Sequence, residues 1–281
     1  MVEIKTHTIA GHGGFILVKI YGHRGASAEL PENTLPAFQR VIDLGADGVE
    51  FDVHLSSDGV PVVIHDDTVD RTTRAIGPVN SFTAEELGNL DAGAGYGVPT
   101  LREVLDLVGT SLHLNIEIKS AEAGQAVIDE VVPRLGLRWA ISSFDWEVLR
   151  FVRGQCPGAD VWPLTFGPRD SIPAAADRVA AMDGIYPNAL RMAEKLRRTR
   201  NVLEDALDLA RDLKSSTVSV NQFTLTQESI DAVHRAGFAT FVWTVNDPQR
   251  ASQLDRWGVD SVCTDEPAVV VPARSSVLSV A

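Results

Sequence analysis

Two stretches of the sequence alternate strictly between apolar residues and polar or ionisable ones. In residues 49–55 the second set is Glu50, Asp52 and His54, and in residues 112–119 it is His113, Asn115, Glu117 and Lys119. A period of two is that of a β-strand, so each set occupies one face of its strand. Taken alone, the pattern fits an antiparallel sheet with one face in water as well as a buried strand that carries a site.

Three of these residues, Glu50, Asp52 and Glu117, are carboxylates whose burial is costly unless they are paired or bind a metal. Two like charges about 4 Å apart repel by a few kcal/mol at an effective dielectric constant of about 20. The three groups are therefore expected to have raised pKa values or to hold a cation. Oxygen ligands favour a hard ion, so the cofactor is predicted to be one divalent metal ion, Mg²⁺ or Ca²⁺. Lys119 is expected to steady a carboxylate or to contact a phosphate oxygen.

Short strand-like runs alternate with helical segments along the chain. The predicted strands are residues 16–22, 48–55, 112–119, 138–142, 160–165, 217–221, 239–244 and 259–264. Helices are predicted from Asn33, Asn201, Thr226 and Asp247, which are all residue types that favour a helix N-cap. Strands that alternate with helices are parallel, and at this length they indicate a (β/α)8 TIM barrel of the α/β class. Its helices would cover the apolar strand faces, so the ionisable faces would point toward the barrel axis.

The barrel is predicted to be a single domain over residues 1–281, with its core at about 17–270. Residues 66–99 form a short insertion after the second strand. The segment around 166–215 is larger than one strand–helix unit needs, and it contains an extra strand candidate, Met182–Tyr186.

The overall composition excludes several classes of protein. The chain has 281 residues and a formal net charge of −13, which disfavours nucleic acid as a partner. Its two cysteines are too few for a disulfide framework or a thiolate metal site. The sequence shows no signal-peptide pattern and no apolar run long enough to span a bilayer. We therefore expect a cytoplasmic protein without stable membrane insertion, whose helical exterior would allow a homo-oligomer.

Seven segments resemble motifs of the glycerophosphodiester phosphodiesterase family. They are residues 23–25 (HRG), 31–34 (PENT), 45–53 (GADGVEFDV), 58–59 with 63–66 (DG and VIHD), 115–119 (NIEIK), 242–246 (VWTVN) and 264–267 (TDEP). Each motif is too short to carry weight alone. The seven occur in the family's order over nearly the whole chain, which makes coincidence an inadequate explanation.

The resemblance implies a (β/α)8 barrel that hydrolyses a glycerophosphodiester to an alcohol and sn-glycerol 3-phosphate. The general acid–base pair would be His23 and His65. The metal ligands would be Glu50, Asp52 and Glu117. The substrate contacts would be Arg24 and Lys119 at the phosphate and Trp243 in the pocket.

Elementary chemistry is consistent with these roles. A phosphodiester is anionic, so a cation and Arg24 would neutralise the charge that develops in the transition state. Two imidazoles would supply a base for the attacking hydroxyl and an acid for the leaving alkoxide. Two rival functions remain, namely the same chemistry on a lysophospholipid or sugar phosphodiester, and a barrel that binds phosphate or metal without turnover.

Several polar residues have both a structural and a functional interpretation. His54 would support the protein structure or the metal ligands, and His113 would pack near the barrel floor. Asn33 would cap a helix or contribute to the site. Asp66 would orient His65, and Asp265 would close the last strand-to-helix turn.

Overall fold

A computed structural model describes residues 18–182 and 189–278, and within this part of the chain eight parallel strands close into a barrel. The strands are β1 (Lys19–His23), β2 (Gly48–Leu55), β3 (Pro61–Val63), β4 (His113–Ile118), β5 (Arg138–Ser143), β6 (Asp160–Thr165), β7 (Thr217–Asn221), β8 (Ala239–Trp243) and β9 (Ser261–Thr264). They pair in the order β1-β9-β8-β7-β6-β5-β4-β2, and a β1–β2 pairing completes the ring. The short β3 pairs antiparallel with β2 and is additional to the barrel. The predicted TIM barrel is confirmed.

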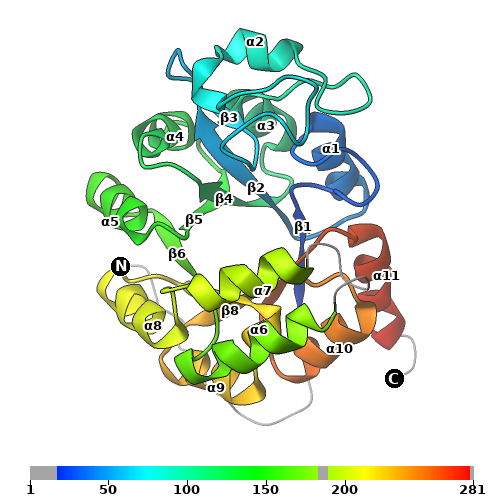
Figure 1. The fold of residues 1–281 in the computed structure, drawn as a ribbon, viewed down its shortest axis with the longest axis vertical. Coiled ribbons are helices and arrows are strands. Elements are labelled where there is room, and N and C mark those ends of the chain that lie inside the picture. The colour runs from blue at the N-terminus through cyan, green and yellow to red at the C-terminus, as the bar shows by residue number, and fades with distance from the viewer. Residues whose placement is uncertain (1–17, 183–188, 279–281) are drawn as a thin grey trace.

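Helices surround the barrel on its outside (Figure 1). They are α1 (Leu35–Asp43), α2 (Ala84–Asn89), α3 (Leu101–Val108), α4 (Ala123–Val131), α5 (Trp146–Gln155), α6 (Ile172–Ala180), α7 (Ala189–Arg198), α8 (Leu203–Asp212), α9 (Gln227–Arg235), α10 (Pro248–Arg256) and α11 (Pro267–Leu278). No helix in the described ranges is both long and apolar enough to cross a membrane.

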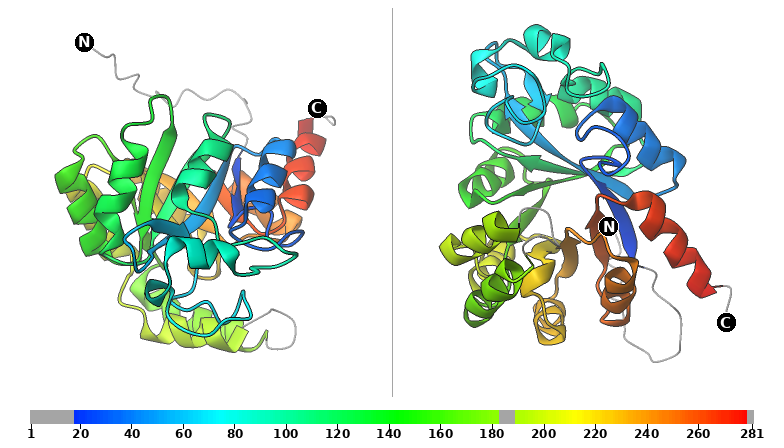
Figure 2. Two further views of the ribbon diagram at one scale, coloured as in Figure 1. Left: turned by 90° about the horizontal axis from the view of Figure 1, so that it is seen from above. Right: turned by 45° about the vertical axis from the view of Figure 1, so that its right-hand side comes forward.

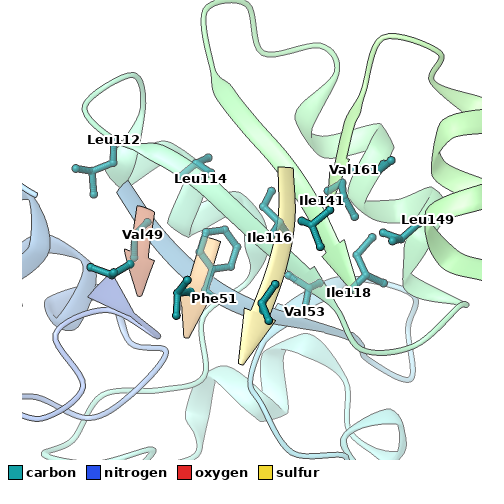
Figure 3. Close-up of a cluster of buried hydrophobic side chains, with 14 of the residues drawn as sticks. Val49, Phe51, Val53, Leu112, Leu114, Ile116, Ile118, Ile141, Leu149 and Val161 are labelled. Carbon is teal, nitrogen blue, oxygen red and sulfur yellow. The ribbon is translucent and has the colours of Figure 1, made fainter. Parts of the chain in front are cut away.

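The apolar faces of β2 and β4 point outward to the helices, as predicted. Val49, Phe51 and Val53 are fully buried and lie in one cluster with Ile116 and Ile118 of β4 (Figure 3). Burial of each such side chain contributes about 1.5–3 kcal/mol. The opposite, ionisable faces are thereby held toward the barrel axis, because successive side chains on a strand point to opposite sides.

The segment after β2 forms a small subdomain on the rim of the barrel. It includes β3 and α2, and it has an apolar cluster of its own that contains Val69, Val79 and Leu87. The helix α2 begins with a capping box in which Thr83 and Glu86 each accept from the other's backbone N–H. The predicted insertion at 66–99 is therefore a packed unit whose first residues follow β3.

The enlarged segment contributes two helices beyond the minimal barrel, α6 and α7. They pack on each other through a second apolar cluster that includes Ala176, Val179, Ala193 and Leu196. Figure 2 shows this pair at the same end of the barrel as the insertion that contains α2. The predicted strand at Met182–Tyr186 falls largely outside the described residues.

Two predicted helix starts are displaced. The helix α8 begins at Leu203 with Val202 at its N-cap, so Asn201 does not cap it. The amide of Asn201 instead donates to the carbonyl of Phe144 at 2.7 Å. Similarly, α1 begins at Leu35 with Thr34 at its N-cap, and this frees Asn33 for another role.

Candidate active site

A cavity of about 590 Å³ opens at the carboxyl ends of the barrel strands, the end where TIM-barrel enzymes carry their chemistry. Of the eight predicted site residues, seven line it: His23, Arg24, Glu50, His65, Glu117, Lys119 and Trp243. The eighth, Asp52, is fully buried beside them and contacts several of them. The structure thus brings together the eight predicted site residues.

The three carboxylates come from two adjacent strands. Asp52 of β2 lies directly opposite Glu117 of β4 in the parallel register, and Glu50 lies one pleat below Asp52 on the same face. Each offers one oxygen atom, and these atoms lie within 4.8 Å of one another. All three residues are at most 9% exposed. The register of one strand pair therefore builds the acidic cluster.

Two cations already contact this cluster. The Lys119 ammonium lies 2.5 Å from Glu117 Oε1 and 2.9 Å from Asp52 Oδ1. The Arg24 guanidinium lies 3.3 Å from Asp52 Oδ2, and the backbone N–H of Arg24 donates to Glu50 Oε2 at 3.2 Å. Asp52 is thus paired on both oxygens, whereas no lysine or arginine side chain of the described ranges forms an ion pair with Glu50, which has only the imidazole of His23 at 3.9 Å.

The difference in pairing separates the pKa values of the carboxyl groups. Burial, with the nearby charge of Asp52, raises the pKa of Glu50 to about 8. Burial also opposes ionisation of Asp52, but Lys119 and Arg24 outweigh it and hold the pKa of Asp52 well below its usual range. With a pKa of about 8, the Glu50 carboxyl group is mostly protonated at pH 7. It becomes an ionised metal ligand there only if a further cation lies beside it.

These residues fit a hard divalent cation. The donor set consists of carboxylate oxygens, which Mg²⁺ and Ca²⁺ prefer. Its members are close enough to share one ion, and Glu50 lacks the charge that an ion would supply. The cluster of Glu50, Asp52 and Glu117 could therefore bind a metal.

His23 stands at the end of β1 and is held by a carboxylate from the far end of the chain. Its Nδ1 lies 2.5 Å from Asp265 Oδ1, and its Nε2 lies 3.9 Å from Glu50 Oε2. Asp265 follows β9, the neighbour of β1 in the barrel, and it also accepts from Ser27 Oγ and Asn246 Nδ2. Asp265 was predicted to close the last strand-to-helix turn. The structure gives its side chain a further role, because it positions His23.

His65 follows β3 and has its own carboxylate. Its Nδ1 lies 2.5 Å from Asp66 Oδ1, in agreement with the prediction that Asp66 orients it. His54 lies behind it, with its Nε2 3.2 Å from the carbonyl of His65. His54 therefore supports the loop that carries His65.

The two imidazoles differ in charge preference. Burial disfavours the charged form of both, but Asp265 outweighs burial and raises the pKa of His23. For His65 burial prevails, so its pKa is lowered. Groups whose environments push their pKa values apart are suited to act as an acid and a base on one substrate.

An aromatic wall closes one side of the cavity. The Trp243 ring meets Phe144 and Phe166 edge to face, with centroids 5.5 Å and 5.7 Å apart. The indole Nε1 of Trp243 is buried and has no hydrogen-bond partner among the described residues. Trp243 itself lines the cavity, which agrees with its predicted pocket role.

Three further residues hold the site: Asn33, for which a helix cap and a site role were both predicted, and Arg71 and Glu32, which were not recognised in the sequence. Asn33 donates from Nδ2 to Asp52 Oδ2 at 2.9 Å, so its contact is with the site and not with the following helix. Arg71, from the insertion, binds Glu32 with two hydrogen bonds of 2.7 Å and also contacts Asp66. Glu32 in turn pairs with Arg24 at 3.0 Å. For Glu32, only its position within the 31–34 motif could have suggested this role, and Arg71 has no such signal in the sequence.

His113 lies away from the site, on the barrel floor as predicted. Its ring stacks on Trp162 with centroids 5.5 Å apart and meets Tyr21 edge to face. Burial lowers its pKa to about 4. His113 is therefore a neutral packing residue.

The fold and the site together define a TIM-barrel hydrolase with an acidic cluster and two carboxylate-supported imidazoles. Residues 23–269 match the model of the glycerophosphoryl diester phosphodiesterase family. The chain belongs to this family, and it is a phosphoric diester hydrolase.

The chain is similar over most of its length to members of this family. A glycerophosphodiester phosphodiesterase of Caldanaerobacter subterraneus is 33% identical over 266 residues, which cover 90% of this chain and 96% of that protein. The crystal structure of a glycerophosphodiester phosphodiesterase from Thermotoga maritima has a TM-score of 0.69 and 29% identity, and the match covers 93% of this chain and 99% of that one. An Oleispira antarctica phosphodiesterase in complex with the product sn-glycerol-3-phosphate matches with a TM-score of 0.74 and 24% identity, over 92% of this chain and 97% of that one, and shows the shared fold.

Proposed function

We propose that this enzyme hydrolyses a small glycerophosphodiester to an alcohol and sn-glycerol 3-phosphate, with one divalent metal ion and two histidines. The observation that carries this proposal is the convergence of three buried carboxylates and two imidazoles, His23 and His65, on one cavity. Separate strands supply these groups, and a purely structural role would not require them at one place.

The ion, Mg²⁺ or Ca²⁺, would be held by Glu50, Asp52 and Glu117 and would supply positive charge to a phosphate oxygen. Arg24 and Lys119 already point into the same cavity, so they would bind other phosphate oxygens. Their own pairing with Asp52 fixes their positions before the substrate arrives. Charge that builds up on the phosphorus oxygens in the transition state would thus meet preorganised cations.

The two histidines would transfer protons on opposite sides of the phosphorus. One imidazole would take the proton of the attacking hydroxyl, and the other would give a proton to the leaving alkoxide. Asp66 and Asp265 accept from the Nδ1 atoms, which leaves both Nε2 atoms free to face the substrate. Each carboxylate thereby fixes the tautomer of its histidine, as a proton-transfer role requires.

The experiment is a substrate panel with the purified protein, supplied in turn with Mg²⁺, Ca²⁺ or a chelator. The panel contains glycerophosphoethanolamine, glycerophosphocholine and lysophosphatidylcholine. Release of the alcohol, ethanolamine or choline, is measured for all three, and release of glycerol 3-phosphate is measured for the two glycerophosphodiesters. We expect cleavage of the glycerophosphodiesters that chelation abolishes and the metal restores. Cleavage confined to lysophosphatidylcholine would favour a lipid substrate, and no cleavage of any compound would overturn the proposal.

Matched histidine variants test the proposed roles. His23→Ala and His65→Ala should each lower kcat by about 10²–10⁴. His234→Ala is the control, because His234 pairs with Asp260 on the outside of the barrel and does not line the cavity. Full activity in either His23→Ala or His65→Ala would contradict the assignment of that residue.

A further inference from the structure

The helix α7 presents two basic side chains to the mouth of the active site. Its small and apolar stripe, which includes Ala193 and Leu196, packs against α6. Arg191 and Lys195 lie one turn apart on another face, and both line the cavity. The packing of α7 on α6 (Figure 1) thus fixes these two side chains over the substrate site.

Lys195 occupies the aromatic wall of the cavity. Its ammonium lies 4.2 Å from the ring centroid of Phe144 and 6.0 Å from that of Phe166, which are cation–π distances. An aromatic face of this kind is the usual site for a substrate's quaternary ammonium group. Here the protein supplies the cation itself, so a cationic alcohol moiety would meet a like charge.

A second lobe of about 420 Å³ adjoins the main cavity on this side. The two share seven residues, so the lobe begins where the phosphate would lie: His65, Asp66, Glu117, Lys119, Phe144, Arg191 and Lys195. The other residues of the lobe are the polar Asp67, Thr68, Ser143 and Asp145, together with Ile118. A substituent of the phosphate that enters this lobe passes next to Arg191 and Lys195, and it meets polar rather than apolar surface.

Among the described residues, the carboxylate whose charge acts on Lys195 is that of Glu117, which already pairs with Lys119. No ion pair within the described ranges joins Arg191 or Lys195 to a carboxylate, whereas Arg197 and Arg198 of the same helix pair with Asp177 and Glu194. Like charges one helical turn apart destabilise a helix. Their position at the mouth of a substrate cavity indicates that the missing negative charge arrives with a ligand.

We propose that Arg191 and Lys195 form an anion subsite for the alcohol moiety of the substrate. The enzyme then prefers diesters whose alcohol carries a further anionic group, such as a carboxylate, over diesters whose alcohol carries only an ammonium group. This inference rests on the proposed function, because it places the phosphate between the histidines and the alcohol in the second lobe.

The test compares two substrates that differ by one carboxylate, glycerophosphoserine and glycerophosphoethanolamine. Their kcat/KM values are measured for the native enzyme and for Lys195→Gln, Arg191→Gln and Lys195→Arg. We expect the native enzyme to favour glycerophosphoserine by about tenfold, the contribution of one charge-assisted hydrogen bond. Lys195→Gln and Arg191→Gln should each lower this ratio severalfold, whereas Lys195→Arg, which keeps the charge, should retain most of it.

Arg198→Gln is the matched control, because Arg198 lies on the same helix but pairs with Glu194 and does not line either cavity. Its substrate ratio should equal that of the native enzyme. A native ratio near one that Lys195→Gln leaves unchanged would overturn the anion subsite while the proposed function stands. Failure to cleave either substrate would overturn the proposed function and the subsite with it.

Discussion

The pairing of His23 with Asp265 can be tested by a change of one atom, Asp265→Asn. Asn246 fixes how the new amide must turn, because its Oδ1 accepts from the backbone N–H of residue 265 at 2.9 Å. Its Nδ2 donates to the side chain of residue 265 at 2.6 Å. The asparagine oxygen must therefore face Asn246, and its NH₂ group must face His23 Nδ1.

An NH₂ group at this position reverses the tautomer of the histidine. Nδ1 of His23 becomes an acceptor, so the proton of the neutral ring moves to Nε2, the atom that faces Glu50 and the cavity. The loss of the carboxylate charge also removes the interaction that raises the pKa of His23. Both effects impair proton transfer, and we expect kcat to fall by about 10²–10⁴, or about 3–5 kcal/mol of transition-state stabilisation.

The assay is the steady-state rate of glycerol 3-phosphate release from glycerophosphoethanolamine at saturating metal. Asp43→Asn is the control, because Asp43 is an exposed aspartate that accepts a hydrogen bond from Gln39 and does not line the cavity. Circular dichroism and thermal unfolding establish that both variants are folded. A kcat for Asp265→Asn within about fivefold of the native value would refute the tautomer argument.

Three further predictions concern the metal ligands, the insertion and the barrel floor. Glu50→Gln should weaken binding of the divalent ion at least about tenfold in calorimetric titration, because it removes an ionised ligand; unchanged affinity would exclude Glu50 from the donor set. Arg71→Gln should lower kcat by about tenfold or more, since Arg71 bridges Glu32 and Asp66; a native kcat in this variant would show that the bridge is dispensable. The pKa of His113 is about 4 in the folded protein and 6.5 in the unfolded chain. As the pH falls from about 6.5 to about 4, the unfolded chain binds a proton that the folded protein does not, so the folded protein loses stability relative to its value above pH 6.5. The measurement is the free energy of urea unfolding of the native protein and of His113→Phe at pH 7 and at pH 4. Between these pH values the native protein should lose up to about 3 kcal/mol more than the variant. Equal losses in the two proteins would contradict the buried, neutral state of His113.

The sequence alone determined the barrel and the chemical groups of the site. The alternation in residues 49–55 and 112–119 fixed which side chains face the axis, because a strand has only two faces. The flanking helices then required parallel strands, and the carboxyl ends of parallel strands meet at one rim. For that reason the pattern of residue types was sufficient to place Glu50, Asp52, Glu117 and Lys119 together.

Only the tertiary structure decided which partner holds each of these groups. The contact of His23 with Asp265 joins residues 242 positions apart, and it exists because barrel closure sets β1 beside β9. Arg71 and Lys195 reach the site from the insertion and from α7, which are additions to the minimal barrel whose direction depends on their packing. The hydrophobic period of the sequence, two residues for a strand and 3.6 for a helix, shows which side chains share a face of that element. Contacts between elements far apart in the sequence depend in addition on how those faces pack together.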